Sequence, residues 1–273
     1  MYSLSSNTNN CSAVVAVSIP ALAHASTHAL VNASAHLKNT VVVLAAKNSP
    51  QQSLDSIAFA SAVAAPALPV MVIQALSGDL PAQVNAGGAY SVKLASPQPL
   101  EAGSTDLQVV SRIEETIKVL PLASTFTFFE YSGSKDAKSV LIVPGTAPLL
   151  LEEIFTGSEV GVLRVRVFRP WSNAHLLAAL PVSAKNVSVL EAAGADVVSG
   201  SAFGTLFMDI AASLAGESRE VKEIRVKGEV DSSSVIRSIL EAAKATNTGA
   251  VSLSGDVELS QVYLWSPPMP RPT

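Results

Sequence analysis

Short apolar runs alternate with helical patterns along the chain, and this alternation predicts an α/β protein. The runs 41–44 and 69–76 are typical of buried parallel strands. Between these runs, Ser49-Pro50 favours the start of a helix. After the second run, Thr105 favours the start of another helix, which ends at Pro121. The apolar face of this second helix is expected to comprise Leu107, Val110, Ile113 and Ile117. Strand–helix–strand order with short links indicates a parallel α/β layer.

The second half of the chain shows the same alternation more clearly. Its predicted strands are 139–143, 161–168, 186–190 and 223–230, and its predicted helices are 147–155, Ser172 to Pro181, 203–214 and one capped by Asp231. Right-handed crossovers then predict an open, mostly parallel sheet with helices on both faces. Arg164 and Arg166 fall on one side of run 161–168, which we expect near a sheet edge or beside a partner.

Charge is spread unevenly and divides the chain into two regions. The sequence holds 18 Lys and Arg and 22 Asp and Glu residues, and only five of these lie in its first hundred positions. We expect a covered first domain over 1–124, a second over 125–260 and a Pro-rich tail or linker over 261–273. The aromatic stretch Phe126, Phe128, Phe129 and Tyr131 is expected to form an apolar plug between the domains.

The totals argue against several classes of partner. The net charge is −4 with no basic cluster, which disfavours nucleic-acid binding. Charged residues make up 15%, against about 25% in typical proteins. Some apolar surface is therefore expected to meet another domain or subunit, and a homo-oligomer is expected.

Compartment signals point to the cytoplasm. The single thiol of Cys11 cannot form an internal disulfide, which fits a reducing compartment. Residues 1–37 contain no charged side chain, so the basic residues of a secretory signal or a mitochondrial presequence are lacking. The uncharged span 57–78 is interrupted by Pro66 and Pro69, and it is expected to be a buried helix and strand rather than a membrane span.

Three strand-to-helix turns are candidates for ligand contacts, because α/β sheets bind ligands at the carboxyl ends of their strands. The turn at Thr146 could hold an anion on free N–H groups, although it lacks the lysine and glycine spacing of a phosphate loop and an ordinary capped turn is the favoured interpretation. The segment 200–204 is neither a dinucleotide fingerprint nor a nucleophile elbow. Arg169, Trp171 and Ser172 could contact a carboxylate or phosphate, or a neighbouring domain.

Metal and acid–base chemistry find little support. His24 and His28 are four residues apart, which places both on one helical face, but no carboxylate lies near them to complete a metal site. The pairs Glu114-Glu115 and 152–153 are interpreted as solvated helix faces rather than acid–base pairs. No metal or catalytic residue is assigned.

The second region resembles the second domain of pyruvate:ferredoxin oxidoreductases. In that family a strand ending in Arg-Pro-Phe leads to a helix ending in Leu-Pro and then to a strand carrying Val-Leu-Asp. Here the matching runs are 160–172, 175–181 and 187–190, with Trp171 in the aromatic position and Glu191 in the acidic one. A fainter echo of the family's next segment lies at 204–210. The resemblance covers about residues 125–215, and a weaker similarity extends over the first region.

The resemblance implies two stacked α/β domains with mostly parallel sheets. The first would be a degenerate domain like the thiamine-diphosphate fold, and the second would resemble the transketolase C-terminal domain. A fragment of this kind is also similar to the amino-terminal part of the fungal NADPH-dependent assimilatory sulfite reductase flavoprotein (alpha) subunit. The segments 128–137 and 263–267 support this branch.

The cofactor signatures of these enzymes are not found in the sequence. The Gly-Asp-Gly…Asn motif for magnesium and thiamine diphosphate is absent, and so are the flavin motifs and the cysteine sets of iron–sulfur clusters. The resemblance therefore implies a non-catalytic assembly region of a sulfite reductase in sulfate assimilation. FAD and NADPH would bind outside this chain, and other domains or subunits of the complex, including a sirohaem protein, would be its partners.

Two other functions remain open. One is a subunit of a split thiamine-dependent 2-oxoacid:acceptor oxidoreductase. The other is a free-standing protein that binds a small anion at Thr146 or Arg169.

Overall fold

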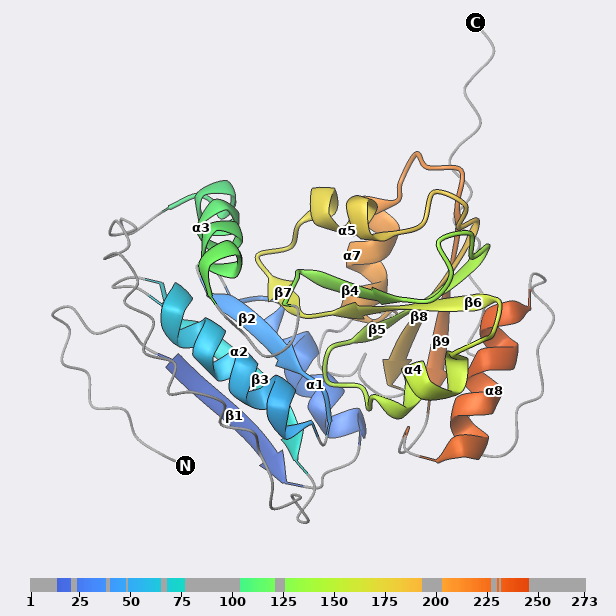
Figure 1. The fold of residues 1–273 in the computed structure, drawn as a ribbon, viewed down its shortest axis with the longest axis horizontal. Helices are drawn as coiled ribbons and strands as arrows, with labels where there is room; N and C mark the ends of the chain where they lie inside the picture. Colours follow the sequence, from blue (N-terminus) through green and yellow to red (C-terminus); the bar gives the residue numbers. More distant parts are fainter. Residues whose placement is uncertain are drawn as a thin grey trace, which may run out of the picture.

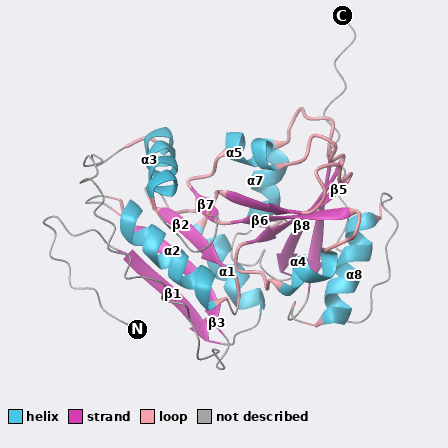
Figure 2. Cartoon of the chain, in the orientation of Figure 1, coloured by secondary structure: helices cyan, strands magenta, loops and turns pink. Residues whose placement is uncertain are grey.

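The fold is known from a computed structural model, and the described residues are 14–20, 24–37, 40–47, 49–64, 68–76, 104–120, 126–192, 203–226, 230 and 232–245. They form two β-sheets with helices packed around them (Figures 1 and 2). The expected class, α/β with two mostly parallel sheets, is confirmed.

The first sheet has four strands in the order β1-β3-β2-β7. Its strands are β1 (Val14–Pro20), β2 (Val41–Ala45), β3 (Val70–Leu76) and β7 (Val167–Arg169). The first three are parallel, whereas β7 runs antiparallel to β2. The helices of this half are α1 (His24–Ser34), α2 (Pro50–Val63) and α3 (Asp106–Val119). Helix α2 packs on β2 and β3 and on α3, whereas α1 contacts both β3 and the second sheet.

The second sheet has five strands in the order β4-β6-β5-β8-β9. Its strands are β4 (Phe129–Ser132), β5 (Ser139–Pro144), β6 (Val160–Val165), β8 (Asn186–Ala192) and β9 (Glu220–Val226). All neighbours are parallel except β4, which is antiparallel to β6. The helices are α4 (Leu150–Phe155), α5 (Asn173–Ala179), α7 (Thr205–Ser213) and α8 (Ser233–Lys244).

The alternation of side chains along β5 divides the interior into two layers. Val140 and Ile142 belong to a core that contains α7 and extends into the first sheet. Leu141 and Val143 point to the opposite face and pack with α4 and α8. Successive side chains of a strand point to opposite faces, so a continuous apolar run such as 139–143 requires helices on both faces, as predicted.

Helix caps follow the sequence signals closely. Ser49 Oγ accepts a hydrogen bond from Gln52 N at 3.4 Å, and Thr105 forms a capping box with Gln108. The predicted cap of α8, Asp231, is corrected to Ser232. The Oγ of Ser232 accepts a hydrogen bond from Val235 N, and Asp231 lies outside the described residues.

The predicted apolar face of α3 is partly wrong. Leu107 is 78% exposed, whereas Val109 and Ile113 are buried. Arg112 is also buried, and its Nε donates to the carbonyl of Val63 at 2.8 Å. The helix is therefore rotated toward α2 so that an arginine takes an interior position that a purely apolar pattern does not anticipate.

Strand β6 lies one strand from the edge of its sheet, which agrees with the expectation of a strand near an edge, but the two arginines do not face solvent. Strand β6 lies between β4 and β5, and Arg164 and Arg166 are 1% and 0% exposed. Polar partners inside the protein take the place of solvent or a second chain. Among the described helices, none is long and apolar enough to cross a bilayer.

Candidate functional site at the junction of the two sheets

One extended segment connects the two sheets. Strand β6 ends at Val165 in the second sheet, and β7 begins at Val167 in the first. The residue between them, Arg166, donates its backbone N–H to the Phe128 carbonyl at 2.9 Å, and its own carbonyl accepts from Leu44 N at 2.8 Å. The backbone therefore fixes Arg166 at the point where the sheets meet.

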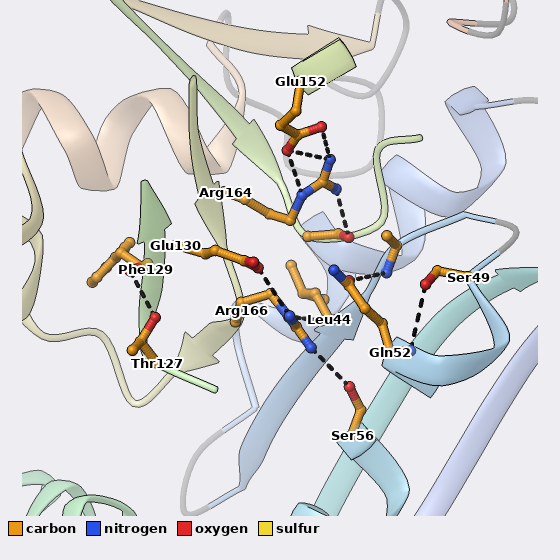
Figure 3. Close-up of polar contacts among 12 residues, drawn as sticks. Leu44, Ser49, Gln52, Ser56, Thr127, Phe129, Glu130, Glu152, Arg164 and Arg166 are labelled. Atoms are coloured by element: carbon orange, nitrogen blue, oxygen red, sulfur yellow. Dashed lines mark hydrogen bonds and ion pairs between the residues drawn. The ribbon is translucent and has the colours of Figure 1, made fainter. Parts of the chain in front are cut away.

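The Arg166 side chain is bonded to both halves of the protein (Figure 3). Its Nη1 donates to Glu130 at 3.0 Å, its Nη2 to Ser56 Oγ at 3.4 Å and its Nε to the Leu44 carbonyl at 3.2 Å. The guanidinium also lies 4.8 Å from the ring centroid of Phe126. Burial lowers the pKa of Arg166, and the negative charge of Glu130 opposes this effect.

Arg164 fills the neighbouring position at the end of β5. It binds both carboxylate oxygens of Glu152 at 2.8 Å, a bidentate pair that fixes its orientation (Figure 3). Its Nη1 donates to the carbonyls of Gly145 and Ala147, and its Nη2 donates to that of Pro148. One buried cation thus satisfies three carbonyls of the strand-to-helix turn, those of Gly145, Ala147 and Pro148. We call Arg164, Arg166 and their partners the closed junction.

The predicted anion contact Thr146 lies inside this junction. It is 3% exposed, and its carbonyl accepts from Lys47 N at 3.2 Å. Its Oγ1 has no hydrogen bond within the described part of the protein. A Cβ on the preceding Gly145 would lie 2.3 Å from the Val165 carbonyl oxygen and 2.5 Å from Leu44 Cβ. The turn is therefore packed directly against β2 and β6.

The end of β8 is occupied by two buried carboxylates. Glu191 Oε1 accepts from Phe207 N at 2.9 Å, and Glu223 Oε1 accepts from Gly204 N at 2.9 Å. Both contacts satisfy free N–H groups at the start of α7. Arg225 pairs with Glu223, and burial raises the pKa of the Glu223 carboxyl. Of the candidate segment 200–204, only Phe203 and Gly204 lie within the described residues.

The predicted contact Arg169 pairs with groups of the chain itself. Its Nη2 binds Asp209 Oδ2 of α7 at 2.8 Å, and its Nε donates to the Ala35 carbonyl at 3.1 Å, just beyond α1. The guanidinium stacks 4.1 Å above the Phe168 ring. Burial raises the pKa of Asp209, and the charge of Arg169 opposes the shift.

Trp171 completes the aromatic plug that the sequence predicted. Its ring contacts Phe129 and Phe168 edge-on, with centroids 5.4 and 6.4 Å apart. Phe126 stacks on Phe59 of α2 at 4.3 Å. The aromatic side chains thus join the two sheets of the protein.

Ser172 forms a link that sequence reasoning missed. Ser172 is the N-cap residue of α5, as predicted, but its side chain makes no capping hydrogen bond, and its Oγ lies 2.7 Å from His175 Nδ1. His175 Nε2 lies 3.1 Å from Glu114 Oε1 of α3, and the imidazole stacks on Phe128 at 4.0 Å. Glu114 was expected on a solvated face, and no local signal connects it to a histidine 61 positions away. The link joins α3 to α5 across the junction.

The histidine pair of the first region lies on a helix as expected. His24 and His28 both belong to α1, whose side chains at these positions are outside the described set. Within the described residues, no group of three metal-ligating side chains comes together.

A cavity opens on the other side of the same segment. It has a volume of about 470 Å³ and is lined by residues that include Arg169, Trp171, Asp209 and Asp106. Thr40 and Leu68, which precede β2 and β3, also line it. The cavity therefore lies at the amino ends of these strands, opposite the closed junction. We call it the Arg169 cavity.

Comparisons with known proteins agree with the family resemblance. The chain is 33% identical over 88 residues to a pyruvate:ferredoxin oxidoreductase of Moorella thermoacetica, a match that covers 30% of this chain and 7% of that one. It is 46% identical over 68 residues to a probable pyruvate-flavodoxin oxidoreductase of Escherichia coli, which covers 23% of this chain and 6% of the relative. No protein-family profile matches the chain. The chain therefore carries a pyruvate:ferredoxin oxidoreductase-like α/β domain.

A sulfite reductase is among these relatives. The chain is 34% identical over 145 residues, 51% of its length, to the sulfite reductase [NADPH] subunit beta of Schizosaccharomyces pombe. The resemblance set out above was to the flavoprotein (alpha) subunit, whereas this relative is named as the beta subunit. The matched part of the chain spans a tenth or less of the length of these three relatives.

One solved structure also overlaps the fold. A 2-oxoglutarate:ferredoxin oxidoreductase from Magnetococcus marinus aligns over 67% of this chain and 39% of that chain, with a TM-score of 0.36 and 13% identity. A likeness at this level bears on neither the fold nor the function.

Proposed function

We propose that the chain is a non-catalytic framework and assembly region of an NADPH-dependent sulfite reductase in sulfate assimilation. The similarity to a sulfite reductase subunit over half of the chain supports the complex to which it would belong. Because the relative is named as a beta subunit, we assign the chain to the sulfite reductase complex and not to its flavoprotein subunit in particular. FAD and NADPH would bind elsewhere in the complex.

The observation that carries the proposal is the way the chain fills the places where α/β sheets hold coenzymes. Such ligands lie beyond the carboxyl ends of the strands. At β5 this space holds Arg164, at β2 it holds Arg166, and at β8 it holds Glu191 and Glu223. Arg164 and Arg166 donate to the protein's own carbonyls and side chains, and Glu191 and Glu223 accept from its backbone N–H groups, so these four side chains do not fit thiamine diphosphate.

Association and cofactor content together test the proposal. The purified chain, alone and mixed with sulfite reductase subunits, would be followed by sedimentation velocity with absorbance detection. We expect the chain to co-sediment with the complex or to self-associate, and to carry no flavin absorbance. A stoichiometric flavin band in the isolated chain, or a monomer that joins no subunit, would overturn the proposal.

The second candidate is a subunit of a split thiamine-dependent 2-oxoacid:acceptor oxidoreductase. It is favoured by the matches to pyruvate oxidoreductases, which are 33–46% identical to this chain over 68 to 102 residues. Under this function, a second chain would supply the coenzyme motif. Calorimetry with thiamine diphosphate and magnesium separates the two functions, because binding would then depend on adding that second chain.

A further inference from the structure

The Arg169 cavity has the size and the chemistry of a ligand site rather than of a packing defect. Its volume of about 470 Å³ falls within the range of about 300–1,000 Å³ that is usual for small-ligand pockets. Its lining includes the aromatic side chain of Trp171 and the apolar side chains of Leu68 and Val109. Such a mixture of apolar walls with a few polar groups is typical of a specific pocket.

The charges on the cavity wall select against a free anion. Its described ionisable lining groups are Asp106, Asp209 and Arg169, so carboxylates exceed cations by one. Asp209 already neutralises Arg169 at 2.8 Å, and the guanidinium is further held by two backbone carbonyls. An incoming phosphate or carboxylate would meet a satisfied arginine and two negative charges.

A cation with an apolar stem matches the same surface. Burial has already raised the pKa of the Asp209 carboxyl, which means that its charged form lacks solvation there. A positive group would restore that stabilisation, and Asp106 at the first turn of α3 also lines the cavity. The indole of Trp171 offers a face for a cation–π contact or for packing of the stem.

We propose that the Arg169 cavity binds an organic cation, an alkylguanidinium or alkylammonium group carried on an apolar stem. The carboxylates of Asp209 and Asp106 hold the charge, and Trp171, Leu68 and Val109 hold the stem. The inference is independent of the assembly role, because it concerns the amino-end face of the first sheet rather than the closed junction. A free amine and a basic side chain of a neighbouring protein segment share this chemistry.

Tryptophan fluorescence tests the site directly. Trp171 and Trp265 are the two tryptophans of the chain, so Trp265→Phe leaves Trp171 as the single reporter. In this background, n-butylguanidinium would be titrated at pH 8. We expect a saturable change in Trp171 emission, and binding at least about tenfold weaker for the neutral isostere n-butylurea.

Charge variants provide the matched controls. Asp106→Asn alters an exposed side chain at the start of α3 and is expected to weaken n-butylguanidinium binding at least about threefold, with a larger loss for Asp209→Asn. Glu153→Gln removes the same charge from an exposed position of α4. This helix packs on the face of the second sheet opposite to α7, so the affinity for n-butylguanidinium is expected to stay unchanged. Butylurea binding as tightly as the cation, no saturable change with the cation, or equal losses in D106N and E153Q would overturn the proposal.

A second probe distinguishes a free small cation from a basic side chain of a protein segment. A blocked peptide, acetyl-Leu-Arg-Leu-amide, presents the same guanidinium on a polypeptide. Binding tighter than that of n-butylguanidinium by about tenfold assigns the site to a protein segment, and equal or weaker binding assigns it to a free small cation.

Discussion

The closed junction and the Arg169 cavity lie on opposite sides of one strand segment and use the same residue type in contrasting ways. Arg164 and Arg166 are buried, and backbone carbonyls and a carboxylate or hydroxyl surround each guanidinium. Arg169, three residues on, is 14% exposed and faces a cavity. The carboxyl-end face, where α/β proteins usually hold ligands, is therefore filled by the closed junction, whereas the amino-end face opens into the Arg169 cavity.

The largest expected effect is on the closed junction. Arg166→Met removes contacts to Glu130, Ser56 and the Leu44 carbonyl, and should lower the free energy of unfolding by about 3 kcal/mol. Arg169→Met, the matched control, removes a more exposed guanidinium and should cost about 1 kcal/mol. Urea unfolding followed by circular dichroism measures both. Equal losses would remove the distinction between the two regions.

Glycine 204 tests the filled end of β8. A Cβ there would lie 2.0 Å from Glu191 Cδ, whereas the backbone φ of −65° suits alanine. Gly204→Ala should therefore cost about 2 kcal/mol by displacing the carboxylate that caps α7. Gly157→Ala, where a Cβ meets nothing within 4 Å but φ is 79°, should cost about 1 kcal/mol. A larger loss for Gly157→Ala than for Gly204→Ala in urea unfolding would contradict the claim that the tight contact with Glu191 limits the side chain at position 204.

The pH dependence of stability should show the burial of Glu223. Because its folded-state pKa is raised above the unfolded value, the folded protein holds this proton more tightly. The resulting cost is absent below the unfolded pKa and is complete once the pH has risen through the folded pKa. The stability of the wild type relative to Glu223→Gln should therefore fall over the pH range that begins at 4.5, the ordinary pKa of a glutamate side chain. Urea unfolding across this range measures the difference, and a rise with pH would contradict the assignment.

The smallest expected effect is at the link between α3 and α5. His175 and Glu114 are 31% and 40% exposed, so their pairing should contribute only about 0.5 kcal/mol. A double-mutant cycle with His175→Asn and Glu114→Gln measures this coupling at pH 6. A coupling above about 2 kcal/mol would mean that the exposed link, and not the closed junction, holds the halves together.

Sequence patterns predicted most of the fold because its strands and caps are local signals. The runs at 41–44 and 186–190, and the caps at Ser49 and Thr105, lie where the structure has them. Strand β1 carried no prediction, although its run 14–20 is apolar, and β9 begins three residues before the predicted start. The turn residues around Thr146 and Arg169 were correctly placed between strand and helix.

The partners of the site residues could not be predicted, because they are distant in sequence. Arg166 meets Ser56 across 110 positions, and Arg169 meets Ala35 across 134. Alternation along 161–168 showed that Arg164 and Arg166 share a face, but not whether that face is exposed. Only the packing of β2 against the β6–β7 segment decides that both are buried.

The most direct test of the central claim is calorimetry of the chain with thiamine diphosphate and magnesium. The account predicts no binding heat, because the carboxyl ends of β2, β5 and β8 are bonded to the protein's own side chains. Saturable one-to-one binding by the chain alone would contradict it.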